Sequence, residues 1–285
     1  MQYDAYIKES QFLPQEDFTF AHLETENEIR EYLKLMRKVF GDDPAVELMI
    51  KKFLYAHPKM MLKNHFVMKH RKKIVAGLIL IPVNWSVEDI PLKTAEMGCV
   101  ATLEEYRNQG LMRRLIGEYH RQVDAEGYDL SVIEGIPYFY HQFGYSYALA
   151  LNEETAIPLQ RIRRSASKLK IRPFTFDDIA EAAELLEQTQ KKFLVHCSRD
   201  KQIWRMQQET GIACEYQFES FAIEEHGKML AYFRINQKPE EKKLILREVT
   251  DASQAVNNAI LSFLKNYGRK HGLDTLVSQT SYHDS

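Results

Sequence analysis

The spacing of hydrophobic residues predicts alternating strands and helices in the first half of the chain. Residues 17–23 alternate between apolar and polar positions, as a half-buried strand does. Residues 26–40 instead repeat apolar side chains every three or four positions, which is typical of a helix that buries one face. Continued to residue 159, the order is strand, two helices, three strands, helix, strand, short helix and strands. This order predicts a mixed α/β fold in which helices flank a central mixed sheet.

Residues that favour helix ends support this order. Asp43 is a natural N-cap, and Pro44 then occupies the first position of the second helix. A later helix is expected to start at Gln109 and to end at Gly127, because glycine readily adopts the backbone conformation that terminates helices.

The second half of the chain repeats a similar order of elements. Residues 171–190 predict a strand, an aspartate N-cap and a helix, and a hairpin is expected to turn at residues 226–228. Residues 242–279 predict a strand, a helix and a strand. The repeated order favours a structural duplication, although few residues are identical between the two halves.

A basic segment separates the two halves. Residues 161–173 contain six basic residues and no apolar periodicity, so we interpret 161–172 as a solvated linker. The alternative is a nucleic-acid-binding arm, whose affinity would fall steeply with salt concentration. The predicted organisation is a first domain at 1–160, a linker at 161–172 and a second domain at 173–285.

Composition argues against several classes of function. The 285-residue chain is 45% hydrophobic and has a formal net charge of −2, so we expect a folded protein that binds neither nucleic acid nor a membrane surface. Its longest apolar stretch is far shorter than the roughly 18 residues of a membrane span, and its first residues contain no apolar signal core. The three cysteines match neither a metal-binding pattern nor a disulfide framework. We therefore expect a cytoplasmic protein without a bound metal.

One turn between a strand and a helix is suited to binding an anion. Gly110 lies between Arg107 and Arg113, where the strand that contains residues 100–102 gives way to a helix. The first amide groups of a helix have no partner within it and lie at the positive end of the helix dipole. Because glycine has no side chain, a phosphate or pyrophosphate can approach these amides closely. The stretch matches neither a Walker loop nor a dinucleotide fingerprint, since both need further glycines.

Two motifs in this half resemble those of a known family. The stretch GCVATLEEYRNQGLMRRLI is similar to the acyl-CoA-binding motif of the GNAT superfamily of N-acetyltransferases, and YHQFGY is similar to the family's Tyr-x-x-Phe-Gly-Phe/Tyr ending. The matching positions are Val100, Thr102, Tyr106, Arg107, Gly110, Tyr140, Phe143, Gly144 and Tyr145. Glu104 stands where the motif usually has proline, and Met112 stands where it has a small residue. The resemblance extends over about residues 17–150 and is weaker in the second half, where residues 171–179 and the order of elements are similar to the family's opening.

The resemblance implies that the chain uses acetyl-CoA as an acyl donor. In this family the strand that carries Val100 and Thr102 separates from the next strand, and its free backbone groups bind the pantetheine arm. The turn and the start of the helix then bind the phosphates. The donor-binding residues implied in this way are Val100, Ala101, Thr102, Arg107, Asn108, Gln109, Gly110, Leu111, Met112 and Arg113.

Proton transfer in the reaction needs an acid and a base. The resemblance implies that Tyr140 is the acid that protonates the leaving thiolate, and its usual pKa of about 10 keeps a tyrosine protonated at neutral pH. Glu96 is a candidate base because, by period two, it shares a strand face with the donor-binding positions, and it resembles the glutamate base of some family members. Glu134 at the end of the next strand and a water relay are the alternatives. His141 is expected to point elsewhere on a short helix.

These residues predict an N-acetyltransferase that transfers an acetyl group to a primary amine of a small molecule or peptide. The acceptor stays open among polyamine, aminoglycoside, amino acid and protein lysine. Asp42, in the turn before the second helix, is a candidate for attracting a cationic amine, although helix capping explains the acidic turn equally well. The alternative from another class is a non-catalytic acyl-CoA-binding sensor or scaffold. The sequence leaves open whether the chain forms a homo-oligomer.

The second half is expected to lack a donor site of its own. Its counterpart of the anion-binding turn, residues 247–261, contains no glycine. Glu248 and Asp251 place negative charge near the start of the helix, where a pyrophosphate would be repelled, and Ser253 is expected to cap that helix. We therefore expect this half to cover the acceptor groove of the first domain and to support its fold.

Overall fold

The computed structural model describes residues 17–41, 44–149, 154–165, 167–213 and 216–279. These residues divide into two compact units. The first unit comprises residues 17–84 and 92–146, and the second comprises residues 85–91 and 147–279. Within the described residues, no helix is long and apolar enough to cross a membrane.

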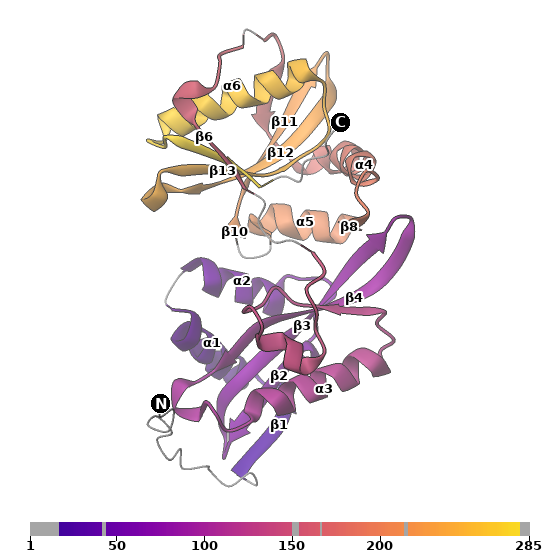
Figure 1. The fold of residues 1–285 in the computed structure, drawn as a ribbon, viewed down its shortest axis with the longest axis vertical. Helices are drawn as coiled ribbons and strands as arrows, with labels where there is room; N and C mark the ends of the chain where they lie inside the picture. The colour runs from indigo at the N-terminus through magenta and orange to yellow at the C-terminus, as the bar shows by residue number, and fades with distance from the viewer. Residues whose placement is uncertain (1–16, 42–43, 150–153, 166, 214–215, 280–285) are drawn as a thin grey trace, which may run out of the picture. The chain divides into compact units, whose positions relative to one another are not determined.

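The first unit contains a sheet in the order β1-β2-β3-β4-β5. Its elements in chain order are β1 (Phe18–His22), α1 (Glu26–Phe40), α2 (Pro44–Tyr55), β2 (His65–His70), β3 (Lys73–Val87), β4 (Ile90–Thr102), α3 (Leu111–Ala125), β5 (Leu130–Val132) and the 3₁₀ helix η4 (Phe139–Phe143) (Figure 1). The strands and helices predicted for residues 17–40 occur where the hydrophobic pattern places them. Thr25 and Glu28 form a capping box at the start of α1, and α2 begins at Pro44 as predicted. Asp42 and Asp43 lie outside the described residues.

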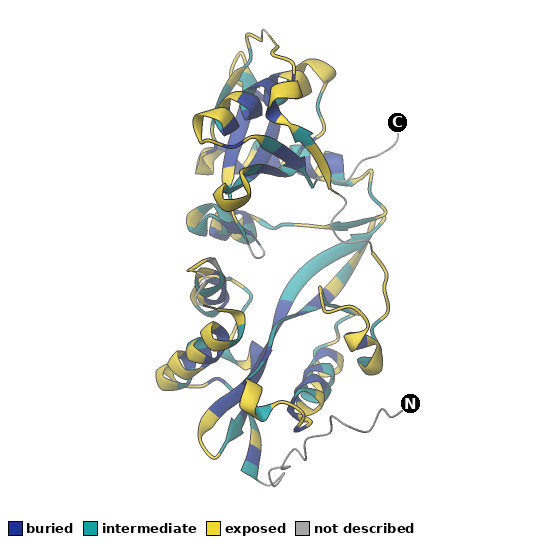
Figure 2. Ribbon diagram, turned by 60° about the vertical axis from the view of Figure 1, so that its left-hand side comes forward, coloured by how far each residue is buried: buried dark blue, intermediate teal, exposed yellow. Residues whose placement is uncertain are grey.

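Helices cover both faces of this first sheet. Neighbouring residues of a strand point to opposite faces. His65 of β2 contacts Tyr32 of α1, with ring centroids 5.7 Å apart, and the next residue, Phe66, contacts Tyr119 of α3 at 5.9 Å. The apolar side chains of the helices and strands meet in a hydrophobic core of buried residues, dark blue in Figure 2. The positions of β4, β5 and α3 are therefore held by packing on both sides of the sheet.

The second unit contains a sheet in the order β6-β14-β13-β12-β11-β7. Its elements in chain order are β6 (Thr155–Pro158), β7 (Lys170–Pro173), α4 (Ile179–Gln190), β8 (Val195–Cys197), α5 (Lys201–Thr210), β9 (Ile212–Ala213), β10 (Tyr216–Gln217), β11 (Glu219–Glu225), β12 (Lys228–Lys238), β13 (Lys243–Val249), α6 (Gln254–Lys270) and β14 (Thr275–Ser278). The hairpin turn of β11 and β12 lies at His226 and Gly227, as predicted, and both residues have positive φ angles. One core packs α6 against one face of the sheet, and another packs α4 and α5 against the opposite face.

The two sheets share an order of strands and a sense of pairing. The antiparallel strands β1 and β2 correspond to β7 and β11, and the parallel pair β4 and β5 corresponds to β13 and β14. The two helices α1 and α2 follow the first strand of one unit, as α4 and α5 follow β7 in the other. Each sheet also has one further strand. β6 pairs with β14 in the second sheet, and β8 pairs with residues 85–87 of β3, which belong to the second unit.

The segment predicted as a linker is part of the second unit. Residues 147–149 and 154–160, expected at the end of the first domain, are grouped with this unit. Strand β7 pairs with β11, and Ile162 is buried in the core beneath α6 with only 5% of its surface exposed. The physical reason is that strands 155–158 and 170–173 satisfy the hydrogen-bonding groups at the two edges of the sheet. The basic side chains between these strands hide the apolar pattern from which strand pairing would be predicted.

Candidate active site

The strands β4 and β5 form a fork in the first sheet. They pair in parallel at only three positions, which join Thr94, Ala95 and Glu96 to Leu130, Ser131 and Val132. Strand β5 ends there, whereas β4 continues to Thr102. Beyond the fork, the β4 edge has no pairing with β5, so backbone groups of residues 97–102 can accept another extended chain.

Strand β4 has an irregular backbone just beyond the fork. Cys99 has a φ angle of 50°, in the left-handed region that non-glycine residues seldom occupy. A Cβ atom at Gly98 would lie 2.7 Å from the side chain of Ile81, so a larger residue there would force Ile81 to move. Ala95, Met97 and Ala101 are buried, as the predicted alternation requires, whereas Cys99, expected on the same face, is only partly buried where the backbone is irregular. Glu96, Gly98, Val100 and Thr102 are all partly exposed.

The turn after β4 leaves the first amides of α3 accessible. Asn108 and Gly110 have φ angles of 62° and 73°, which glycine and asparagine tolerate better than other residues. A Cβ atom at Gly110 would meet nothing within 4 Å, so the space in front of the helix is open. The first backbone bond of the helix joins the Arg114 amide to the Gly110 carbonyl at 3.2 Å. The amides of residues 111–113 therefore precede that bond and can donate to an anion.

The side chains of this turn divide between the interior and the solvent. Gln109 and Leu111 are buried, at 6% and 2% exposure, so only their backbone groups face the turn. Arg107 and Asn108 are exposed, and Met112 is partly exposed. Helix α3 starts at Leu111, later than the predicted Gln109, because the positive φ angle of Gly110 interrupts the helical backbone. Two exposed arginines and a row of free amides give the turn a positive potential.

One of these arginines also connects α3 to the segment that contains Tyr140. The Arg113 guanidinium donates to Gln142 Oε1 at 2.7 Å and lies 5.3 Å from the centre of the Phe143 ring. Tyr140 lies between these residues in sequence, on η4, and is 8% exposed. Burial and the neighbouring Tyr145 raise the pKa of Tyr140, so its hydroxyl is protonated at neutral pH. Within the described residues this hydroxyl makes no hydrogen bond.

A chain of hydrogen bonds lies beside Tyr140 and was not anticipated from the sequence. Tyr119 of α3 donates to the Ala95 carbonyl at 3.1 Å, and its oxygen lies 2.9 Å from Ser131 Oγ. Ser131 Oγ is 2.7 Å from the Tyr145 hydroxyl, which is 3.3 Å from His120 Nε2. The chain links both strands of the fork to α3 and to the YHQFGY segment. Tyr145 was the one member within a recognised motif, and nothing local in the sequence pairs it with Ser131.

The two candidate bases differ in their surroundings. Glu96 is partly exposed and occupies the last paired position of the fork, opposite Val132. The pKa of Tyr119 is raised mainly by burial and then by the neighbouring Tyr145. The negative charge of Glu96 makes a smaller contribution in the same direction. Glu134 is exposed in the segment that follows β5, and His141 is exposed beside Tyr138. Glu96 is thus the carboxylate closer to the fork.

The chain's relation to known proteins agrees with this geometry. Residues 21–148 match the family model described as the acetyltransferase (GNAT) domain. This match identifies residues 21–148 as a GNAT domain. The matched residues include the fork, the turn before α3 and η4, so all the groups described above lie in the GNAT domain.

Solved structures extend the similarity of fold over both units. The chain is similar to a GCN5-related N-acetyltransferase from Anabaena variabilis, at 18% identity and a TM-score of 0.71, over 94% of this chain and 67% of that one. It is also similar to one from Kribbella flavida, at 14% identity and a TM-score of 0.71, over 94% and 65%. A third is Saccharomyces cerevisiae N-myristoyltransferase with bound myristoyl-CoA, at 15% identity and a TM-score of 0.64, over 95% and 79%. The predicted mixed α/β fold of the GNAT type is confirmed.

These similarities concern the fold. All three identities are low, and the chain spans about two thirds of the length of the two acetyltransferases. Comparison with curated proteins finds no match by sequence. The GNAT domain is an acyltransferase domain by its family, and its donor and acceptor are considered below.

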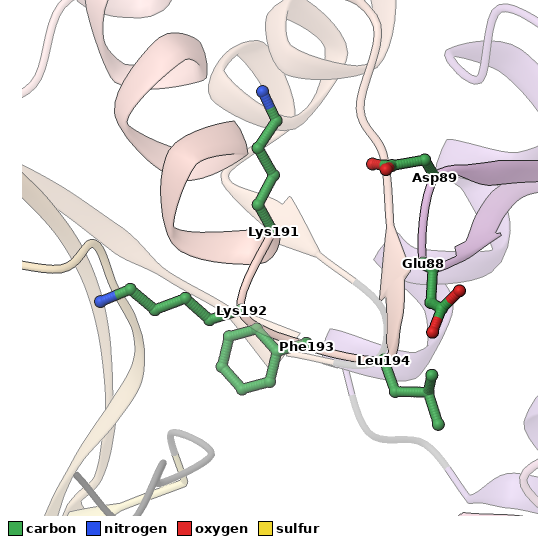
Figure 3. A pocket seen from close by; sticks show the side chains of 6 residues that line it. All are labelled: Glu88, Asp89, Lys191, Lys192, Phe193 and Leu194. Atoms are coloured by element: carbon green, nitrogen blue, oxygen red, sulfur yellow. The ribbon is translucent and has the colours of Figure 1, made fainter.

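A pocket of about 260 Å³ lies in the second unit, away from the GNAT domain's fork in sequence. It is lined by Glu88, Asp89, Lys191, Lys192, Phe193 and Leu194. Figure 3 shows the ammonium groups of Lys191 and Lys192 pointing in different directions, and the two carboxylates likewise diverge. Because these charges do not converge on one point, the pocket lacks the arrangement that would hold a charged ligand.

In the described part of the chain, no cluster of three or more His, Cys, Asp or Glu side chains is arranged to hold a metal ion.

Proposed function

We propose that the GNAT domain transfers an acetyl group from acetyl-CoA to a primary amine by direct attack on the thioester. The observation that carries this proposal is the fork, whose unpaired β4 edge leads directly into the open turn before α3. An extended, amide-containing arm can pair with such an edge, and a pyrophosphate can accept hydrogen bonds from the helix amides. One ligand that contains both groups in sequence is coenzyme A.

The residues present fit this donor. The backbone of Val100, Ala101 and Thr102 would bind the pantetheine arm. The amides of residues 109–113 and the side chains of Arg107, Asn108 and Arg113 would bind the phosphates. Met112 is partly exposed at the mouth of the turn, and Gly110 leaves that mouth open. The buried side chains of Gln109 and Leu111 would anchor the turn.

The catalytic roles follow from proton transfer. The amine must lose a proton to attack the thioester carbon, and Glu96 at the fork is the proposed base. When the carbon–sulfur bond breaks, the thiolate needs a proton, and Tyr140 is the proposed donor. The raised pKa of Tyr140 supports a protonated hydroxyl at neutral pH, and its lack of a hydrogen-bond partner among the described residues supports its availability. The acceptor is a small molecule or peptide that carries a primary amine.

We propose that the second unit is a GNAT-like domain without donor chemistry. Its strand order supports the relationship. The Ser253 side chain caps α6 by accepting from the Val256 amide at 3.4 Å. Because this side chain already occupies one of the first amides of α6, a phosphate would bind less well at the start of this helix than at the start of α3.

A matched pair of variants tests donor binding. Gly110→Asn and Gly110→Asp place side chains of equal size at the mouth of the turn, and both residues tolerate a positive φ angle better than most. They differ by one negative charge, which at about 4 Å from a pyrophosphate charge costs roughly 1–4 kcal/mol. Calorimetric titration should therefore show acetyl-CoA binding weaker by about fivefold or more for Gly110→Asp than for Gly110→Asn. Equal affinities would contradict the phosphate site.

Turnover separates catalysis from the alternative of an acyl-CoA sensor or scaffold. Incubation of the chain with acetyl-CoA and a panel of polyamines, aminoglycosides, amino acids and lysine peptides should release free thiol with at least one acceptor. Tight acetyl-CoA binding without thiol release from any acceptor would favour the sensor.

A further inference from the structure

The ring of Tyr140 is held on two sides. A Cβ atom at Gly135 would lie 2.4 Å from Tyr140 Cε2, so the ring occupies the space that a larger residue would need. The ring of Tyr145 meets it edge to face, with centroids 6.2 Å apart and planes at 80°. The backbone also joins these residues, since the Tyr145 amide donates to the Tyr140 carbonyl at 3.3 Å. The orientation of Tyr140 therefore depends in part on where Tyr145 is fixed, alongside the ring contacts with Phe139 and Phe143.

Only one assignment of donors and acceptors satisfies all the hydrogen bonds around Tyr145. The Ala95 carbonyl can only accept, so Tyr119 must donate to it. Tyr119 then accepts from Ser131, and the single hydroxyl proton of Ser131 is used in that bond. Tyr145 consequently donates to Ser131 Oγ and accepts from the N–H at His120 Nε2. Burial lowers the pKa of His120, which favours the neutral ring that this arrangement uses.

We propose that Tyr145 is a positioning residue that orients the Tyr140 hydroxyl toward the fork. Its own hydroxyl is anchored at 2.7 Å to Ser131, which lies on the paired part of β5. Because the Tyr145 ring is rigid and its hydroxyl is fixed to β5, its contact with the Tyr140 ring holds that ring in place relative to the fork. Tyr140 has no hydrogen bond through its hydroxyl within the described residues, so packing sets its direction. Gly135, Phe139, Phe143 and Tyr145 surround its ring, and Tyr145 is the one of these that is hydrogen-bonded to the fork. The inference rests on the proposed role of Tyr140 in acyl transfer.

The principal test is Tyr145→Phe, which removes the anchored hydroxyl and keeps the ring. We expect kcat to fall by about 10- to 100-fold, since small misplacements of a catalytic group have effects of this order. The KM for acetyl-CoA should stay within about twofold, because Tyr145 does not contact the proposed donor site. Tyr128→Phe is the control. It removes a phenol hydroxyl at the other end of α3, where the ring packs under Lys93, and should leave kcat unchanged.

A double variant distinguishes positioning from a general structural effect. If Tyr145 acts through the Tyr140 hydroxyl, adding Tyr145→Phe to Tyr140→Phe should lower kcat no further. Multiplied losses in the double variant, or kcat within twofold of wild type for Tyr145→Phe, would overturn the inference while leaving the proposed function intact. A Tyr140→Phe variant as active as wild type would instead overturn both the acid and its positioning. Should Tyr145→Phe fold poorly, Ser131→Ala removes the same anchor from β5 and is expected to give the same loss in kcat.

Discussion

His65 is a buried imidazole whose protonation should destabilise the first unit. It is fully buried, and its Nδ1 lies 3.3 Å from the Met61 carbonyl. Because a carbonyl only accepts, Nδ1 carries the proton and Nε2 is the titrating atom. Nε2 has no hydrogen-bond partner within the described residues, and neither does the hydroxyl of Tyr32, whose ring packs against the imidazole. A charge at Nε2 would therefore be buried without compensation.

The size of the effect follows from the pKa. Burial lowers the pKa of His65 from its usual 6.5 to about 4. Between these values the unfolded chain binds a proton that the folded chain does not, so stability falls as pH falls through this window. At pH 5 the two pKa values correspond to a loss of about 2 kcal/mol relative to neutral pH. This equals about a 30-fold increase in the population of the open state.

Hydrogen exchange measures this loss locally. We compare wild type with His65→Asn, whose amide keeps a donor for the Met61 carbonyl but does not titrate. Protection of amides in β2 and β3, corrected for intrinsic exchange, should fall about 30-fold more in wild type than in the variant between pH 7 and pH 5. His226→Asn, at an exposed turn, should behave as wild type. Equal losses of protection in wild type and His65→Asn would show that burial does not keep His65 neutral.

Three further predictions concern the site and the second unit. Glu96→Gln should lower kcat by about 10²- to 10⁴-fold in thiol-release assays, whereas Glu134→Gln should leave kcat near the wild-type value. The reverse result would show that Glu134 is the base. Glu248→Gln should destabilise the second unit by about 3 kcal/mol, because it leaves the buried guanidinium of Arg234 and its neighbour Arg199 without a counter-charge. Both tryptophans belong to this unit, so urea denaturation followed by tryptophan fluorescence reports it, and a change below about 1 kcal/mol would contradict a structural ion cluster. Calorimetry on the whole chain should give one acetyl-CoA per polypeptide, and two would contradict a second unit without a donor site.

Part of the candidate site is local in sequence and was therefore predictable. The turn around Gly110 is encoded by adjacent residues, since the glycine, the flanking arginines and the start of a helix all lie within a few positions. The alternation of residues along β4 also follows from its own sequence, and it placed Glu96 opposite the buried face. The hydrogen-bond chain is different, because Tyr119, Ser131 and Tyr145 come from three separate segments.

The clearest element missed by periodicity is α5. Its sequence KQIWRMQQET contains few apolar residues, and only Trp204 and Met206 are buried. Its ends were nevertheless encoded locally, since Asp200 accepts hydrogen bonds from two amides at the start and Gly211 adopts a positive φ angle at the end. Capping residues were thus a better signal for this short helix than its hydrophobic pattern.

The sequence by itself determined the elements whose stability is local, including α1, the turn at Gly110 and the hairpin turn at His226. Only the tertiary structure decided where strands stop pairing and which strands share a sheet. The fork exists because β5 ends at Val132 while packing holds β4 onward to Thr102. The segment read as a linker joins the second sheet because the backbone of residues 170–172 pairs with β11, which lies far away in sequence. Pairing between distant strands depends on backbone groups that every residue carries, so side-chain pattern alone cannot specify it.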